Sequence, residues 1–340
     1  MACSLPGSTD PEAVARRKVA SEFDLIARIR GRAASRRDVV LGIGDDAAVL
    51  RTAPGHELVV TMDTLVAGRH FPHATTPRDI GWKALAVNLS DLAAMGAAPA
   101  WITLALTLPR NDVEWLDAFI GGFMALARRH GVALVGGDTT RGPLSITVAA
   151  HGLLPRGSAM RRDGARAGDA IYASGSLGDA AAGLRVARGG LAAAPAAAAR
   201  TLRTRLDRPE PRVALGLALR GVASAAIDVS DGLVQDLGHV LRASGVGAVL
   251  EVDAVPASRA LRAAVGGTAA RRRLQLAGGD DYELCFTVPP RREPRLAAIA
   301  RRLRLPLTRI GTVLPTPGLA LLDARARPVH LRRAGYDHFA

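Results

Sequence analysis

At 340 residues the chain is long enough for two domains of ordinary size, each with its own hydrophobic core. Its formal net charge of +14 would normally indicate a nucleic-acid partner, yet the excess is nearly all arginine, because the only lysines are Lys18 and Lys83. The basic runs also lack the interleaved aromatic residues of a single-strand binding surface. We therefore expect a solvated basic surface and no nucleic-acid partner.

The cysteine content favours a reducing compartment, and the apolar runs do not indicate secretion or a membrane span. Two cysteines, Cys3 and Cys285, cannot form a disulfide framework, and Cys285 lies in a strand-like run typical of a buried thiol. The N-terminus lacks the apolar core of a secretory signal. The longest uncharged run, residues 92–109, is interrupted by glycine and proline and predicts a helix end, a turn and a strand. A cytoplasmic protein without a membrane partner is expected.

The first structured segments follow a flexible extension, which we place at residues 1–20. Ser21 can cap a helix that carries Phe23, Ile26 and Ile29 at helical spacing. The next segment, residues 41–50, reads as an apolar strand that ends in two adjacent carboxylates. Such a strand end needs a cation.

Residues 58–62 predict a further strand with Asp63 at its tip, after a Pro-Gly turn. Together with the opening strand it reads as a hairpin that brings Asp63 close to Asp45 and Asp46. A helix is then predicted from Pro77 to Met95, and Asp91 lies next to its buried leucine stripe.

The middle of the chain alternates strands and helices. Residues 101–108 alternate like a strand, Asn111 is expected to cap the following helix, and Gly131 is expected to end it. Residues 132–135 predict a short strand that delivers Gly136-Gly137-Asp138-Thr139-Thr140. The two glycines would let the backbone approach a phosphate, and the alternative is a tight strand-to-helix turn.

The polar, glycine-rich residues 155–168 make the best domain boundary. Beyond them, residues 175–179 resemble a phosphate-binding turn, although the ending of a P-loop is missing. Residues 230–232 begin a helix whose first amides could hold an anion. Residues 278–283 place two more acids, Asp280 and Asp281, before a strand at 284–288.

Acids at five strand ends in a basic chain indicate a shared site for divalent metal and phosphate. Mg²⁺ prefers carboxylate oxygens together with substrate phosphates. Zinc-binding Cys/His spacings are absent from the sequence, and no serine or cysteine sits in a nucleophile elbow. The reaction class that still fits the sequence is phosphoryl transfer, in which charge neutralisation and positioning carry the catalysis.

Seven motifs in chain order resemble those of the bacterial thiamine-monophosphate kinases, a family of the aminoimidazole-ribonucleotide synthetase superfamily. They are EFDLI at 22–26, GIGDD at 42–46, KALAVNLSDLAAMG at 83–96, GGDTTRG at 136–142, DVSDGL at 228–233, DYELCF at 281–286 and GYDHF at 335–339. The resemblance implies a fold of the α/β class with mixed α+β sheets, in two domains with the active site between them. We therefore expect an N-terminal ATP- and Mg-binding, dimerising domain at 21–154 and a C-terminal α/β domain at 155–340.

The same resemblance implies roles for individual residues. The magnesium ligands would be Asp46, Thr61, Met62, Asp63, Asp91, Asp138, Asp228 and Asp231, with Met62 contributing through its backbone. The ATP contacts would be Gly137, Asp138, Arg162 and Ser230, and the substrate contacts would be His70, Asp280 and Tyr336. Two positions depart from the family pattern, because Met62 replaces a common hydroxyl residue and Asp280 replaces a common Glu.

The implied reaction converts thiamine monophosphate and ATP to thiamine diphosphate and ADP, the last step of thiamine diphosphate biosynthesis. We expect direct in-line transfer assisted by several Mg²⁺ ions, without a general base, in a homodimer. Three alternatives stay open at this point: a sister synthetase of the superfamily, a nucleic-acid-binding protein with structural Mg²⁺, and a nucleotide-binding module without catalysis. Cys3 lacks the glycine-rich setting expected of a selenophosphate synthetase.

Overall fold

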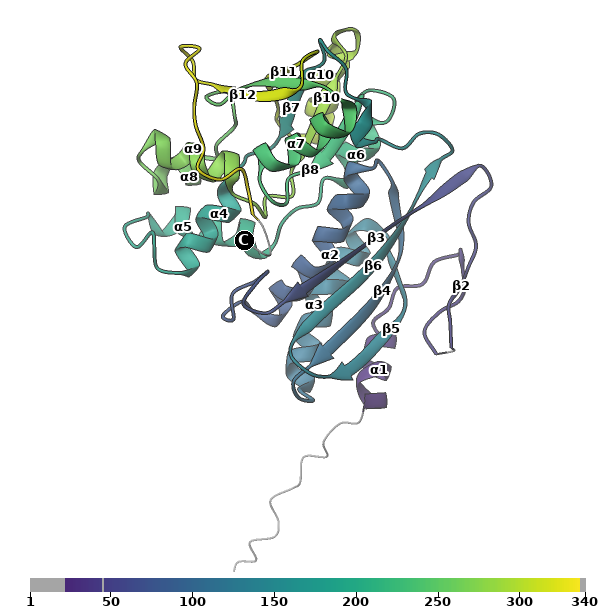
Figure 1. Ribbon diagram of the computed structural model, residues 1–340. Coiled ribbons are helices and arrows are strands. Elements are labelled where there is room, and N and C mark those ends of the chain that lie inside the picture. The colour runs from purple at the N-terminus through teal and green to yellow at the C-terminus, as the bar shows by residue number, and fades with distance from the viewer. Residues whose placement is uncertain (1–21, 45, 337–340) are drawn as a thin grey trace, which may run out of the picture.

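The computed structural model describes residues 22–44 and 46–336. The chain forms two halves that pack side by side, with the first half at the lower right of Figure 1 and the second above it and to its left. The elements of the first half are α1 (Glu22–Arg30), β1 (Val39–Leu41), β2 (Val49–Leu50), β3 (His56–Val66), α2 (Pro77–Ala94), β4 (Ala98–Leu108), α3 (Val113–His130), β5 (Ala133–Arg141) and β6 (Ser145–Pro155).

The elements of the second half are η2 (Arg162–Gly164), β7 (Ala170–Ser174), α4 (Asp179–Ala187), α5 (Ala196–Asp207), α6 (Val213–Leu219), β8 (Ala225–Asp228), α7 (Leu233–Ser244), β9 (Gly247–Glu251), α8 (Arg259–Ala264), α9 (Thr268–Ala277), β10 (Leu284–Val288), η3 (Pro290–Arg292), α10 (Pro294–Leu303), β11 (Leu307–Leu314) and β12 (Gly318–Leu322). Its six strands form one sheet in the order β12-β9-β11-β7-β10-β8. Leucines of α7 pack on one face of this sheet with Cys285, and residues of α6 and α10 pack on the other with Phe286.

The sheet of the first half has the strand order β3-β6-β4-β5, and α2 and α3 cover one of its faces (Figure 1). Side chains alternate between the two faces of a strand. On β3, Thr61, Asp63 and Leu65 are at least partly buried on the inner, helix-covered face, while Val60 and Met62 are exposed on the outer face.

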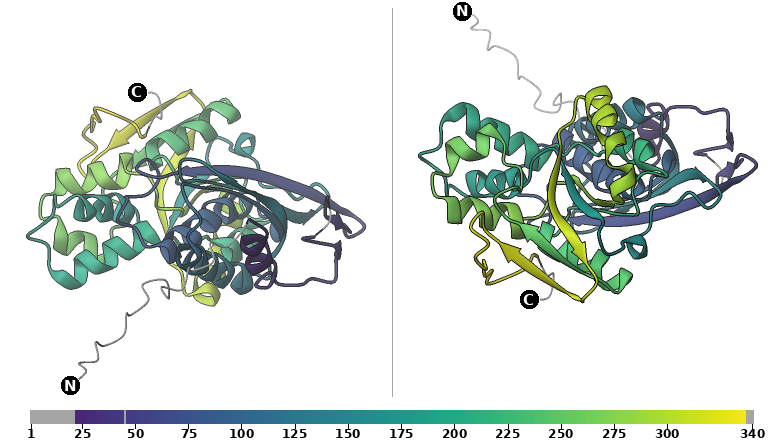
Figure 2. Two further views of the ribbon diagram at one scale, coloured as in Figure 1. Left: turned by 90° about the horizontal axis from the view of Figure 1, so that it is seen from below. Right: turned by 90° about the horizontal axis from the view of Figure 1, so that it is seen from above.

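Helix α2 is the central element of the molecule. Thr76 caps it, accepting a hydrogen bond from the Asp79 amide, and the helix ends before Gly96, which has the left-handed φ of +70°. Its far side packs so closely on α6 that a Cβ at Gly216 would lie 2.1 Å from the Ala93 carbonyl oxygen. One hydrophobic core therefore runs from the first sheet through α2 into the second half. Both views of Figure 2 show the two halves lying against each other.

The predicted hairpin of the two opening strands is wrong. β1 pairs with β2 in a separate two-stranded sheet, and β3 pairs with β6 instead. The glycines at 42 and 44 interrupt the opening strand, whereas β3 extends to Val66, so Asp63 lies inside a strand rather than at its tip. Asp45 itself, residues 1–21 and residues 337–340 lie outside the described residues.

Two local predictions also need correction. Asp112, not Asn111, caps α3, since its carboxylate accepts from the Trp115 amide, while Gly131 ends the helix with φ 64° as predicted. Residues 136–140 do not form a turn, because β5 continues through them in parallel pairing with β4. The predicted helix end, turn and strand over residues 92–109 are confirmed. In the part of the chain described, no helix has the length and apolar character to span a membrane.

Candidate active site

Four predicted metal ligands meet where β3, α2 and β8 converge; we call Thr61, Asp63, Asp91 and Asp228 the acid cluster. Thr61 Oγ1 donates a hydrogen bond to Asp91 Oδ2 at 2.5 Å, and Asp63 shares a hydrogen bond with Asp91. Asp228 comes from the second half of the chain and accepts from Ser90 Oγ at 2.7 Å. The cluster therefore lies between the two halves.

The carboxyl groups of the acid cluster are buried without enough nearby positive charge to neutralise them. Burial, followed by the charge of Asp91, raises the pKa of Asp63 to about 7. Burial also raises the pKa of Asp228 well above its usual range, and the charges of Asp91 and Asp63 add to this. Arg162 works in the opposite direction on the pKa of Asp91, although burial outweighs it. A cation bound here would relieve this repulsion.

The donor set of the acid cluster suits Mg²⁺, which takes carboxylate and hydroxyl oxygens. Within residues 22–44 and 46–336, however, no group of three or more His, Cys, Asp or Glu side chains is arranged to hold a metal ion. The carboxylates of Asp63 and Asp91 instead share a hydrogen bond, which requires a proton between them. An incoming Mg²⁺ would take the place of that proton.

Asp138 and Gly137 do not join the acid cluster. The ladder aligns Asp63 with Val148, Leu104 and Gly137 in one row across β3, β6, β4 and β5. Three strand spacings separate the two ends of the row, about 14 Å. Asp138 is one residue further along and therefore points to the outer face, away from Asp63.

Met62 is also on the outer side of this sheet, and Asp46 precedes residues that pack there. Asp46 is exposed, and Ala48 and Leu50 of the same segment pack against Trp101. The Met62 side chain is 66% exposed, on the face opposite Thr61 and Asp63.

The 230–232 loop binds an internal acid rather than leaving its amides free. Asp236 Oδ2 accepts hydrogen bonds from the amides of Ser230, Asp231 and Gly232 at 3.0–3.1 Å. The prediction that these amides at the start of α7 could hold a bound anion is therefore wrong for all three, because Asp236 already occupies them. The amide of Tyr336 donates to the Asp231 carbonyl at 3.0 Å, which brings two predicted site residues together.

The turn at 175–179 is not a phosphate site either. Asp281 Oδ2 accepts from the Gly178 amide at 2.6 Å, and its Oδ1 accepts from the Ala180 amide at 3.2 Å. A buried carboxylate thus occupies the position that a phosphate would take at the start of α4.

A second buried acid, Glu283, is fully compensated; with Ser174, Arg205 and Arg212 it forms what we call the arginine–glutamate cluster. Glu283 accepts from Ser174 Oγ at 2.6 Å, from Arg205 at 2.7 Å and from Arg212 Nε at 2.6 Å. The arginine excess of the chain was expected to form a solvated basic surface, whereas these two arginines form internal ion pairs.

His70 and Asp280, the predicted substrate contacts, meet through Lys83. The ammonium group of Lys83 donates to the His70 carbonyl at 2.9 Å and contacts Asp280 Oδ1 at 3.1 Å. Asp280 has φ 64°, a left-handed conformation that is costly for a residue other than glycine.

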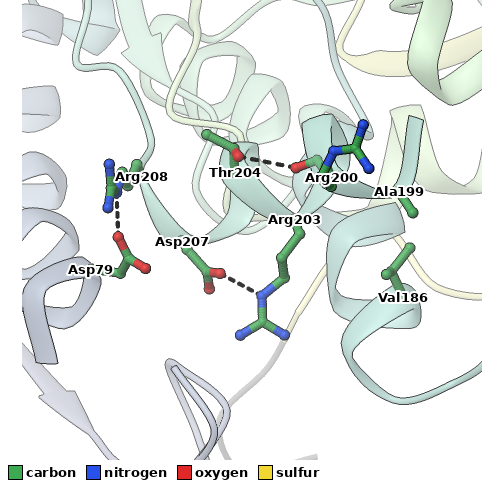
Figure 3. Close-up of a pocket in the computed structure, with 8 residues that line it drawn as sticks. All are labelled: Asp79, Val186, Ala199, Arg200, Arg203, Thr204, Asp207 and Arg208. Carbon is green, nitrogen blue, oxygen red and sulfur yellow. Dashed lines mark hydrogen bonds and ion pairs between the residues drawn. The ribbon is translucent and has the colours of Figure 1, made fainter. Parts of the chain in front are cut away.

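A cavity of about 520 Å³ lies where the first turn of α2 meets α4 and α5 (Figure 3). Two of its arginines are engaged, Arg203 by Asp207 and Arg208 by Asp79. None of the predicted site residues is among those that line it, which are Asp79, Val186, Ala199, Arg200, Arg203, Thr204, Asp207 and Arg208.

The structure adds four residues that the sequence interpretation missed: Ser90, Lys83, Asp236 and Tyr282. Burial raises the pKa of Tyr282 well above its usual range, and the charges of Asp280, Asp63 and Asp228 raise it further, so this phenol stays protonated between the two groups of acids. The sequence did contain one sign that Lys83 is special: only two of the 45 Lys and Arg residues of the chain are lysines.

Comparison with known proteins identifies the family. Residues 44–154 match the family model of the AIR synthase related protein N-terminal domain, and residues 166–323 match that of the C-terminal domain. Thiamine-monophosphate kinase of Salmonella typhimurium is 50% identical over 321 residues, which cover 94% of this chain and 98% of the relative. The chain belongs to the thiamine-monophosphate kinase family. The family assignment made from the motifs is thereby confirmed.

Solved structures of thiamine-monophosphate kinases agree with the fold. The crystal structure of the kinase from Stenotrophomonas maltophilia has a TM-score of 0.83 and 54% identity, and covers 88% of this chain and 96% of that one. AaThiL complexed with AMPPCP and TMP has a TM-score of 0.75 and 30% identity, with coverage of 94% and 97%. The predicted α/β class with two domains of this type is confirmed.

Proposed function

We propose that the protein transfers the γ-phosphate of ATP to thiamine monophosphate and releases thiamine diphosphate and ADP. The acid cluster carries the proposal, because three carboxylates that are poorly neutralised lie between the two halves of a kinase-family chain. The relative AaThiL, solved with the ATP analogue AMPPCP and with TMP, supports both substrates.

Thr61, Asp63, Asp91 and Asp228 would hold Mg²⁺. When bound, the metal supplies the positive charge that lets two phosphate groups approach each other. Tyr282 borders the acid cluster with an apolar ring and a protonated hydroxyl, which helps to exclude water from this side.

Arg162 and Ser230 would contact ATP from the second half. Arg162 already acts electrostatically on Asp91, so its positive charge lies within range of the acid cluster. Asp236 fixes the Ser230 loop by binding three of its amides. His70, Asp280 and Tyr336 would contact thiamine monophosphate, and Tyr336 is held beside Asp231.

The transfer would be direct and in line. The terminal phosphate oxygen of thiamine monophosphate is already anionic and can attack the γ-phosphate without losing a proton to a base. The side chains would therefore act by positioning and by charge stabilisation. The left-handed Asp280 and the threefold-bound Asp236 are fixed groups of the kind that such positioning needs.

A homodimer would complete the site. The outer face of the first sheet exposes Leu58, Val60, Met62 and Val66, an apolar strip that a second copy could cover. Gly137 and Asp138 lie at the far edge of the same sheet, with Asp138 on that face. In a dimer packed through this face, Gly137 and Asp138 of one copy would reach the acid cluster of the other around its edge strand β3. We place the reaction in the cytoplasm, consistent with the free buried thiol of Cys285.

The test is chromatographic detection of thiamine diphosphate after the protein is mixed with thiamine monophosphate, ATP and Mg²⁺. Product that requires both the metal and the monophosphate is expected, with EDTA and free thiamine as controls. ATP consumption without thiamine diphosphate would overturn the proposed substrate. Inactive Asp63→Asn and Asp138→Asn proteins can then be mixed, because shared sites predict that the mixture regains part of the activity.

A further inference from the structure

We propose that Lys83 is a positioning residue for the substrate: its single buried ammonium group ties the His70 loop of the first half to the Asp280 loop of the second. The spacing between the two groups that would face thiamine monophosphate is then set by one side chain. This inference rests on the proposed function, because it takes His70 and Asp280 as substrate contacts.

Lys83 acts from behind the site. Its side chain is 1% exposed, so it does not contact a ligand itself. The ammonium group lies 2.9 Å from the His70 carbonyl oxygen and 3.1 Å from Asp280 Oδ1. Since Lys83 belongs to α2, these two contacts connect both loops to the most buried helix of the molecule.

Two contacts on Asp280 are made by the same carboxylate oxygen. The Tyr282 hydroxyl also donates to Oδ1, at 3.1 Å, so the lysine and the tyrosine share the same oxygen of a side chain that is 30% exposed. The amide of Asp280 donates to the Ser230 carbonyl at 2.8 Å, which holds the left-handed backbone in place. Both side-chain contacts of Asp280 found within the described residues are made by Oδ1, so Oδ2 can accept from, or attract, a cationic substrate.

The His70 ring is oriented in the same way. Its Nδ1 accepts from the Val66 amide at 2.9 Å, while Lys83 fixes the carbonyl of the same residue. A neutral ring whose Nδ1 accepts a hydrogen bond carries its proton on Nε2. Removing the ammonium group would free both loops at once, and leave Asp280 without its cation.

A compact ammonium group fits this position better than a guanidinium. Nearly every other cation of the chain is arginine, yet the fully enclosed position between the carbonyl and the carboxylate holds a lysine. Lys83→Arg therefore keeps the charge and disturbs the geometry, whereas Lys83→Met keeps the length and removes the charge.

The matched control is Trp82→Phe. Trp82 is the preceding residue of α2 and also bridges the two halves, since its Nε1 donates to the Pro209 carbonyl at 2.9 Å. It contacts neither His70 nor Asp280 through any hydrogen bond found in the described residues. Trp82→Phe removes this bond, so its kinetic constants measure the effect of a general weakening of the contact between the halves.

The experiment measures KM for both substrates by steady-state kinetics, and Kd for thiamine monophosphate and AMPPCP by calorimetry. Lys83→Met is expected to raise KM and Kd for thiamine monophosphate about 10- to 100-fold, the cost of a misplaced substrate contact. The values for ATP and AMPPCP should change by less than about threefold, as should all values for Trp82→Phe. Lys83→Met should cost less when added to Asp280→Asn than it costs alone, because only the contact with the His70 carbonyl remains to be lost.

Equal losses for both substrates in Lys83→Met, or losses matched by Trp82→Phe, would overturn the inference. If Lys83→Met is not recovered folded, Lys83→Arg decides in its place: a selective loss for thiamine monophosphate supports the inference and a uniform loss overturns it. A wild-type protein that binds thiamine monophosphate without forming product contradicts the proposed function instead, and the binding constants still test Lys83.

Discussion

The acid cluster and the arginine–glutamate cluster bury carboxylates to a similar depth, with opposite compensation. Asp228 is 5% exposed and Glu283 is 0% exposed. Glu283 is satisfied by two arginines and a serine, whereas Asp228 has, among residues 22–44 and 46–336, only the Ser90 hydroxyl and faces further acids. The arginine–glutamate cluster therefore stabilises the fold, and the acid cluster has a charge deficit that a bound cation can fill.

The largest effect on stability is expected from Glu283→Gln. The amide keeps the shape of the side chain but leaves Arg205 and Arg212 buried without a counter-charge, which should lower the free energy of unfolding by about 3 kcal/mol. Urea denaturation monitored by tryptophan fluorescence measures this. Glu293→Gln is the control, because Glu293 is more exposed and should cost less than about 1 kcal/mol. Similar losses in both proteins would refute the contrast between the clusters.

Asp63→Asn should show the opposite pattern. Turnover should fall at least about a hundredfold, as for the loss of one electrostatic stabiliser. Stability in EDTA should not fall, because the substitution removes a buried charge that repels Asp91. Initial rates and thermal melting with and without Mg²⁺ measure the two effects. Near-normal turnover at saturating Mg²⁺ would exclude Asp63 from the mechanism.

The pH dependence of Mg²⁺ binding tests the charge deficit directly. The pKa of Asp63 rises from the model-compound value of 3.8 to about 7, so folding takes up a proton and stability without metal falls as the pH rises from about 4 to about 7. Mg²⁺ competes with that proton, and its apparent affinity should rise about tenfold from pH 6 to pH 8. Calorimetric titrations in two buffers would detect the released proton. An affinity independent of pH would contradict the shared proton.

The smallest effect is expected from Ser90→Ala. This change removes one neutral hydrogen bond to Asp228 and should weaken Mg²⁺ binding about fivefold. Thr76→Ala, which removes the cap at the distant start of α2, should lower stability without changing Mg²⁺ affinity. A Mg²⁺ affinity unchanged by Ser90→Ala would show that this bond only supports the fold.

Local chemistry made much of the fold predictable. The buried leucines of α2, Gly131 at the end of α3 and the apolar run of β10 are each visible in a short window of sequence. Strand pairing is different, because the partners of β3 and β5 are far apart in the chain. The face and the edge on which Asp138 lies depend on a register that spans four strands, which no local pattern encodes.

The same distinction applies to the site. Asp63, Asp91 and Asp228 could be chosen as acids near apolar segments, and the structure brings them together. Asp281 and Asp236 could not be assigned in this way, since they bind backbone amides of turns that looked available for phosphate. Whether a turn amide is free depends on a carboxylate that arrives from elsewhere in the fold.

Helix α2 packs on both halves of the molecule. A boundary between the halves is therefore visible in the sequence, but neither half is expected to fold alone after the chain is cut there. Severing the chain within residues 156–168 would expose the side of α2 that packs on α6, together with apolar residues of the second sheet. Each fragment alone would carry an unfilled half of one core. The two fragments should therefore behave as a split enzyme, insoluble when expressed separately and functional when produced together.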